Sequence, residues 1–224
     1  MINIQNKLRN FNTEDFLDPR KLHRLILEIG ICERRTDQQP KHLHKYINPY
    51  APWQNPKQLT KLLLFLAEYD INTYFEIGVY RCGTFLLMTE YLDRLNGLEY
   101  ALGVDVSTGV HVEEYKSISK DINTVVKKIS SRSTVLIEEI SSTKFDLILI
   151  DGNHGTKAVI EDFETYRNNG SIILFHDISS VCKDAWDAIK KLSRDEFDFY
   201  EITDQYKTVN KDWFGFGILI KKDS

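Results

Sequence analysis

Apolar residues recur along this chain in two patterns, one typical of helices and one typical of buried strands. The clearest strand is the nearly continuous apolar run from Phe145 to Ile150. A run of this length without alternation predicts a strand buried on both faces, as in the middle of a parallel sheet. It is followed by Asp151, and a second run at 171–175 is followed by His176 and Asp177. Because ligands bind outside the carboxyl ends of such strands, these side chains are expected at a ligand site.

Strands and helices alternate along most of the chain. Helical spacing of apolar residues is found at 13–30, 57–69, 84–95, 117–128, 158–166 and 181–192, and strand-like runs at 73–77, 100–106, 145–150, 172–175 and 215–220. The segment 131–139 is ambiguous, with a strand expected close to it. Such alternation implies parallel pairing with right-handed crossovers and helices on both faces. We therefore predict an α/β fold built on a doubly wound, mostly parallel sheet.

The first 56 residues depart from this alternation. After the helical spacing at 13–30, the stretch 32–56 contains four prolines with histidine, tyrosine and tryptophan residues crowded between them. Linkers are seldom so aromatic, so this stretch is expected to be a structured loop or lid. We predict a helical and lid-like extension over residues 1–56 and a ligand-binding domain over residues 57–224.

Composition narrows the class of protein. The 224 residues are 42% hydrophobic and 28% charged, an ordinary balance that can bury a sizeable core. A net charge of −4 without a basic stripe gives no support for a nucleic-acid partner. Three widely spaced cysteines suggest no disulfide framework and favour a reducing, cytoplasmic setting. There is no signal-peptide core and no apolar run of transmembrane length, so a membrane partner is not expected.

A glycine-punctuated turn joins the strand at 73–77 to the next helix. Gly78 and Gly83 are five positions apart, which is not dinucleotide-binding spacing, and the Lys-Ser/Thr of a phosphate loop is missing. Such a turn lets a ligand approach the backbone and the free N–H groups of a helix start. Glu76 disfavours phosphate and suits an ammonium group, and Asp105 ends the next strand, where an acid commonly binds a ribose. These features indicate a nucleoside joined to a zwitterion, as in S-adenosylmethionine.

The motifs at 76–84, Asp105 and 145–154, in this order, resemble those of class I S-adenosylmethionine-dependent methyltransferases. More narrowly, residues 53–222 are similar to macrocin-type sugar O-methyltransferases and proteins labelled cephalosporin hydroxylase. The resemblance implies a Rossmann-like sheet with an antiparallel last strand and methyl transfer to a hydroxyl of a small molecule, with a sugar-containing metabolite as the suggested class. Adenine contacts are expected near the turn at 130–133. The cofactor-binding residues that it implies are Glu76, Gly78, Tyr80, Gly83, Thr84, Asp105 and Asp151.

The resemblance also implies a divalent metal, Mg²⁺ or Mn²⁺, bound by Asp151, His176 and Asp177. Mg²⁺ prefers oxygen ligands, so His176 either favours ions such as Mn²⁺, Fe²⁺, Co²⁺ or Zn²⁺, or lies beside the metal without binding it. A bound cation lowers the pKa of an alcohol and fixes its position. His154 occupies the place where relatives have a general base, and its ordinary pKa suits that role. Alternatively, His154 is a loop residue that caps the helix expected from Thr156.

Other interpretations stay open at this stage. One is a metal-independent N- or O-methyltransferase in which His154 and His176 act as acid–base groups. Another is a non-catalytic nucleoside-binding protein of the same fold, although Glu76, Gly78, Gly83 and Asp105 are all intact. The glycine spacing argues against a nicotinamide dehydrogenase. Expected partners are a small hydroxylated acceptor and, through the N-terminal helices, further copies of the chain. Weaker candidates for the site are His42, His44 and His111.

Overall fold

The computed structural model describes residues 1–32, 40–107, 113–116, 123–207 and 214–222. Within this part of the chain, seven strands form one sheet in the order β3-β2-β1-β4-β5-β7-β6. The strands are β1 (Thr73–Ile77), β2 (Tyr100–Asp105), β3 (Thr124–Lys128), β4 (Phe145–Ile150), β5 (Gly170–His176), β6 (Phe197–Ile202) and β7 (Phe216–Lys221). Strands β1 to β5 pair in parallel, and β7 is antiparallel to both β5 and β6. The predicted sheet and its antiparallel last strand are confirmed.

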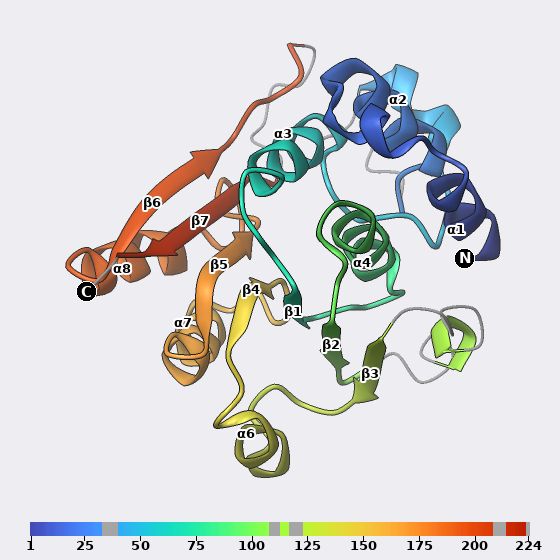
Figure 1. The fold of residues 1–224 in the computed structure, drawn as a ribbon. Coiled ribbons are helices and arrows are strands. Elements are labelled where there is room, and N and C mark those ends of the chain that lie inside the picture. The colour runs from blue at the N-terminus through green and yellow to red at the C-terminus, as the bar shows by residue number, and fades with distance from the viewer. Residues whose placement is uncertain (33–39, 108–112, 117–122, 208–213, 223–224) are drawn as a thin grey trace.

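Helices cover both faces of the sheet (Figure 1). One face carries α4 (Gly83–Asn96) with the N-terminal helices α1 (Ile2–Arg9), α2 (Pro19–Ile29) and α3 (Pro56–Leu66), and the other carries α6 (Thr134–Ile140), α7 (Thr156–Tyr166) and α8 (Lys183–Ser193). Because helices lie on both faces, the predicted double winding is observed. Separately, no helix among the described residues has both the length and the apolar character needed to cross a membrane.

Strand β4 lies at the centre of the sheet and is buried on both faces. Leu147 and Leu149 belong to the apolar core under α4, whereas Ile148 and Ile150 belong to the core under α7 and α8. This double burial explains why the sequence of the strand shows no polar alternation. The one acid in the run, Asp146, accepts hydrogen bonds from the backbone N–H groups of residues 72 and 73, both at 2.9 Å. It ties β4 to the start of β1 and has a structural role.

The N-terminal helices pack onto α4. Ile4 and Leu8 of α1, together with Phe16 and Leu22, are buried in the same apolar core as the inner face of α4. Helix α1 was not predicted, because its eight residues carry few apolar side chains. Since the core is continuous across residue 56, the division into parts 1–56 and 57–224 stays a prediction.

Three elements differ from the sequence-based expectations. Strand β3 occupies residues 124–128, where the predicted helix 117–128 was wrong, and residues 117–122 lie outside the described part of the chain. Helix α6 (Thr134–Ile140) covers most of the ambiguous segment 131–139, where a strand was expected nearby. Strand β6 was not predicted at all. Both unrecognised strands are at the edges of the sheet, where one neighbour and partial exposure weaken the apolar pattern.

Candidate active site

A cavity of about 490 Å³ lies outside the carboxyl ends of β1, β2, β4 and β5. The chain reverses its direction of strand addition between β1 and β4, and such a switch point is where open α/β sheets bind ligands. The structure brings nearly all of the predicted site residues to the wall of this cavity. They are Gly78, Tyr80, Gly83, Thr84, Asp105, Asp151, His154, His176 and Asp177.

The two glycines of the turn are required by close approaches of other backbone segments. Gly78 has a φ of +94°, and a Cβ there would lie 2.2 Å from the carbonyl oxygen of Asp151. A Cβ at Gly83 would lie 2.4 Å from the carbonyl oxygen of Ala51. The first glycine therefore lets β1 and β4 meet at the cavity, and the second lets α4 begin directly against the N-terminal extension.

Glu76 is the predicted cofactor residue that does not reach the cavity wall. Its side chain is buried and accepts a hydrogen bond from the hydroxyl of Tyr74. Burial raises the pKa of Glu76 well above its usual range, and the nearby carboxylates of Asp151 and Asp105 raise it further. The Glu76 side chain therefore lies in the core beside Tyr74, and its role in cofactor binding stays a prediction.

Asp105 holds the backbone of the glycine turn. Its Oδ2 accepts a hydrogen bond from the N–H of Tyr80 at 2.9 Å, and its Oδ1 accepts from the N–H of Ser107 at 2.7 Å. Tyr80 has a φ of 44°, an uncommon conformation that this hydrogen bond helps to fix. The Tyr80 ring lies 5.5 Å from the ring of Trp53, and both residues line the cavity. Through Trp53, the N-terminal extension thus contributes part of the cavity wall.

The opposite part of the wall is formed by the loop after β3. Ser130, Ser131 and Arg132 line the cavity together with Asp162 of α7, which is buried. The Ser131 hydroxyl donates to Asp162 Oδ1 at 2.7 Å. The turn expected near the adenine therefore does border the cavity, and Asp162 is an addition that the sequence alone did not indicate.

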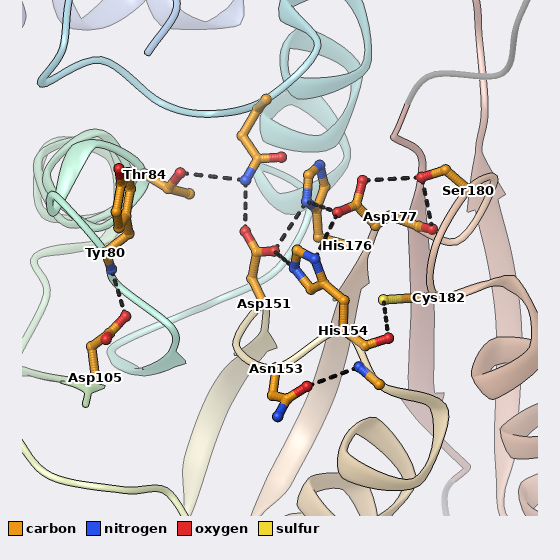
Figure 2. A network of polar contacts seen from close by, with 12 residues as sticks. Tyr80, Thr84, Asp105, Asp151, Asn153, His154, His176, Asp177, Ser180 and Cys182 are labelled. Atoms are coloured by element: carbon orange, nitrogen blue, oxygen red, sulfur yellow. Dashed lines mark hydrogen bonds and ion pairs between the residues drawn. The ribbon is translucent and has the colours of Figure 1, made fainter. Parts of the chain in front are cut away.

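Two acids and two histidines converge at the ends of β4 and β5 (Figure 2). Asp151 Oδ1 lies 3.0 Å from His176 Nδ1 and 3.5 Å from His154 Nε2. Asp177 Oδ2 lies 3.5 Å from His154 Nδ1 and 3.8 Å from His176 Nδ1. Each histidine therefore lies between the same two carboxylates, and we call these four residues the acid–histidine cluster.

The outer oxygen of each acid in the acid–histidine cluster is held by a neutral donor. The Ser180 hydroxyl donates to Asp177 Oδ1 at 3.2 Å, and Asp177 itself has a φ of 62°. Gln54 Nε2 donates to Asp151 Oδ2 at 2.8 Å and to Thr84 Oγ1 at 3.4 Å. The sequence did not indicate Gln54, because an isolated glutamine before Asn-Pro matches no functional motif.

The charges of the acid–histidine cluster stabilise one another. Burial opposes the ionisation of Asp151, but the neighbouring His176 and His154 outweigh it and hold the pKa of Asp151 below its usual value. The hydrogen bond to Asp151 is the main cause that raises the pKa of His154. Burial alone would lower the pKa of His176, yet Asp151 and Asp177 together raise it. The two acids therefore favour positive charge between them, as protons or as a metal ion.

The donor set fits a single divalent cation. One ligand atom each from Asp151, His176 and Asp177 lies within 4.8 Å of the others, and all three side chains are shielded from solvent. Two carboxylates and one imidazole suit Mn²⁺ and similar ions better than Mg²⁺. His176 Nε2 has no hydrogen-bond partner among the described residues, so of the two ring nitrogens only Nδ1 contacts the acids. The sequence-predicted metal ligands are thus brought together.

His154 is more accessible than the rest of the acid–histidine cluster, with 43% of its side chain exposed. Helix α7 has Gly155 as its N-cap and receives no side-chain capping bond, so His154 does not cap it. An exposed imidazole at the cavity wall, beside the candidate metal ligands, can take a proton from a bound molecule. His42 and His44 do not line the cavity, and His111 lies outside the described residues.

Comparison with known proteins agrees with this geometry. Residues 75–178 match the family model described as a methyltransferase domain, while no curated protein matches the chain. An O-methyltransferase from Bacillus cereus in complex with SAH is 15% identical with a TM-score of 0.53, covering 75% of this chain and 82% of that one. The N-methyltransferase NodS from Bradyrhizobium japonicum WM9 is 13% identical with a TM-score of 0.55, covering 91% and 98%. An rRNA methylase from Streptococcus thermophilus is 11% identical with a TM-score of 0.56, covering 77% and 100%.

The fold, a mostly parallel seven-stranded sheet with helices on both faces, is shared with these methyltransferase structures. The matched domain runs from the middle of β1 to just beyond Asp177, and so contains both the glycine turn and the acid–histidine cluster. With this domain, the chain is an enzyme, an S-adenosylmethionine-dependent methyltransferase. The names of the similar structures include both an O-methyltransferase and an N-methyltransferase. They therefore do not indicate whether an oxygen or a nitrogen atom is methylated.

Proposed function

We propose that this enzyme transfers the methyl group of S-adenosylmethionine to a hydroxyl group of a small molecule, with assistance from a divalent metal ion. The observation that carries the proposal is the convergence of Asp151, His154, His176 and Asp177 at the cavity that the glycine turn also borders. These four ionisable side chains come from two neighbouring strand ends and lie at hydrogen-bonding or ion-pairing distances. Partial burial of so many ionisable groups costs free energy, and such clusters are typical of sites that bind and activate a ligand.

The cavity offers a separate region for each part of the cofactor. The free N–H groups at the start of α4, beside Thr84, suit the carboxylate of the methionine end. Asp105 suits the ribose hydroxyls, and the rings of Tyr80 and Trp53 suit a sulfonium through its positive charge. The loop at 130–132 then borders the adenine.

The acid–histidine cluster supplies the groups for activating the acceptor. Asp151, Asp177 and His176 would hold the metal, with Mn²⁺ favoured over Mg²⁺ by the imidazole. A bound divalent cation would lower the pKa of the acceptor hydroxyl and fix its oxygen in line with the methyl group. His154, from its exposed position at the wall, accepts the hydroxyl proton. A sugar-containing metabolite is the first acceptor class to test, on the strength of the resemblance to macrocin-type enzymes.

A second candidate keeps the cofactor and omits the metal. The ion pairs that His154 and His176 form with the two acids favour it, because they already make acid–base pairs without a cation. Turnover after dialysis against a chelator separates the two. If activity on a panel of hydroxylated sugars, followed as S-adenosylhomocysteine released, is lost and returns with Mn²⁺, the metal-assisted mechanism holds. If it persists unchanged, the metal-free mechanism replaces it.

Calorimetric titration tests the cofactor part of the proposal without any acceptor. We expect S-adenosylhomocysteine to bind with one site per chain and Asp105→Asn to weaken it, while NAD gives no heat of binding. Binding of NAD alone would contradict the proposal. The His154→Ala variant should bind S-adenosylhomocysteine normally and lose roughly 100-fold or more in turnover, the lower end of the range for general-base catalysis.

A further inference from the structure

We infer that Gln54, in the N-terminal extension, is a positioning residue that orients the Asp151 carboxylate toward the acid–histidine cluster. The residue lies just before α3 and is almost completely buried, with 1% of its surface exposed. Its role in metal binding rests on the proposed function, but its role in orienting Asp151 does not. Through its bond to Asp151, Gln54 connects the N-terminal extension to the end of β4, 97 positions further along the chain.

The contacts of Gln54 show that it acts through other residues. Its Nε2 donates to Asp151 Oδ2 at 2.8 Å and to Thr84 Oγ1 at 3.4 Å. In Figure 2, dashed lines that leave Thr84 and Asp151 mark these two hydrogen bonds. Asp151 and Thr84 line the cavity, whereas Gln54 is not among the lining residues. Gln54 therefore contacts two cavity-lining side chains on the side that faces away from the cavity.

The orientation of the amide follows from the acid that it faces. If the amide were reversed, Oε1 would lie against Asp151 Oδ2, and two acceptors would repel each other in a buried place. With Nε2 toward Asp151, Oε1 is buried without a partner among the described residues. A buried acceptor without a donor is costly, so the bond to Asp151 must be worth that cost.

The bond from Gln54 matters because an aspartate does not orient its own carboxylate. The χ2 rotation of Asp has a broad, roughly two-fold profile, so neighbouring groups decide where the two oxygens point. Gln54 holds Oδ2, and this leaves Oδ1 at 3.0 Å from His176 and 3.5 Å from His154. Without the donor, Oδ2 would be partly buried and unpaired, and the carboxylate would be free to turn away from the histidines.

Asp177 shows the same arrangement with a different donor. Ser180 holds its Oδ1 at 3.2 Å, and its Oδ2 faces His154 at 3.5 Å. Both acids thus present one inner oxygen to the cluster and give the outer one to a neutral donor. Residues that hydrogen-bond metal-binding carboxylates in this way typically change metal affinity by 10- to 100-fold when they are replaced.

The test compares Gln54→Met with Gln5→Met, both in the full chain. Methionine keeps the volume of glutamine and removes the N–H donor. Gln5 is a matched control, because it is also buried in the N-terminal extension and its Nε2 donates to the Glu90 carboxylate at 3.1 Å, away from the cavity. The first measurement is the imidazole ¹H–¹⁵N spectrum of the metal-free and cofactor-free protein at fixed pH, with the His176 signals assigned through His176→Gln.

We expect the His176 signals to shift in Gln54→Met and to keep their wild-type positions in Gln5→Met. Unchanged His176 signals in a folded Gln54→Met protein would overturn the inference. If that variant does not fold, Gln54→Glu replaces it, since glutamate has the same length and presents an acceptor to Asp151. The second measurement is Mn²⁺ binding followed by electron paramagnetic resonance, where Gln54→Met should bind at least tenfold more weakly. Failure of the wild type to bind Mn²⁺ would refute the metal proposal and leave the spectral test of Gln54 intact.

Discussion

At the scale of single residues, the most unusual environment belongs to Glu76. It is a fully buried acid whose pKa is raised well above its usual range, chiefly by burial. In the unfolded chain its pKa is that of an ordinary glutamate, about 4.3. The folded state therefore favours binding of a proton that the unfolded state releases, and the contribution of Glu76 to stability falls as pH rises above about 4.

Replacement of Glu76 by glutamine should remove this loss. Glutamine keeps the acceptor for the Tyr74 hydroxyl and carries no charge. We expect Glu76→Gln to equal the wild type near pH 4 and to be more stable at pH 8 by about 1 kcal/mol or more, since each unit of pKa shift corresponds to about 1.4 kcal/mol. Urea unfolding at both pH values measures this.

An exposed glutamate provides the control for this experiment. Arg132 lowers the pKa of Glu161 through a side-chain hydrogen bond. Its stabilising charge is present at neutral pH and is lost in acid, so Glu161→Gln should change stability with the opposite sign. If Glu76→Gln is no more stable than the wild type at pH 8, Glu76 is ionised in the folded protein and the raised pKa is contradicted.

Residues that follow a recognisable strand or turn could be located from the sequence. Asp151, His176 and Asp177 follow apolar runs, and the carboxyl ends of neighbouring parallel strands meet at one edge. Gln54 could not be located in this way, because its function depends on a contact with a residue 97 positions away. The sequence located Glu76 before the turn but did not show that its side chain is buried, and its role in cofactor binding stays a prediction.

At the scale of secondary-structure elements, central strands were predicted and edge strands were not. Strand β4 is apolar because both of its faces are buried. In contrast, β6 has one neighbour and exposes most of its residues, and β3, also with one neighbour, fully buries only Val126. A strand that buries only part of one face needs few apolar residues. The spacing of these residues along the sequence then does not distinguish the strand from a short helix or a loop.

The junction between α4 and the N-terminal extension gives a prediction at this scale. A Cβ at position 83 would press on the Ala51 backbone, so Gly83→Ala should lower the free energy of unfolding by about 1–3 kcal/mol, as overpacking commonly does. Because Thr84 and Ala51 line the cavity, the same variant should weaken binding of S-adenosylhomocysteine. Thermal unfolding and calorimetry measure the two effects.

Gly97→Ala separates packing from backbone strain in that experiment. Gly97 ends α4 with a φ of +71°, and nothing lies within 4 Å of the position of its Cβ. Its replacement should cost about 1 kcal/mol through the left-handed conformation and leave ligand affinity unchanged. Equal effects of the two variants on binding of S-adenosylhomocysteine would contradict the proposed coupling between Gly83 and the cavity.

At the scale of the whole molecule, the N-terminal extension and the sheet share one apolar core. Side chains from α1, α2 and α3 pack into the same cluster as the inner face of α4, and Gln54 reaches the end of β4. We therefore predict that a fragment of residues 57–224 loses cooperative unfolding, because α4 and α3 would expose buried apolar surface to water.

Circular dichroism during urea titration, together with sedimentation, checks this against the full chain. The fragment should unfold over a broad range of urea or associate through its exposed apolar face. A monomeric fragment with a sharp transition would contradict this prediction and would make residue 56 a true domain boundary.

The most direct test of metal-assisted methyl transfer is an anomalous difference map from crystals grown with S-adenosylhomocysteine and soaked in Mn²⁺. The account predicts one Mn²⁺ peak bounded by Asp151, His176 and Asp177, with ligand distances of roughly 2.0–2.3 Å and the sulfur of the bound molecule facing it. A map that contains S-adenosylhomocysteine in the cavity and no Mn²⁺ among these three residues would contradict it.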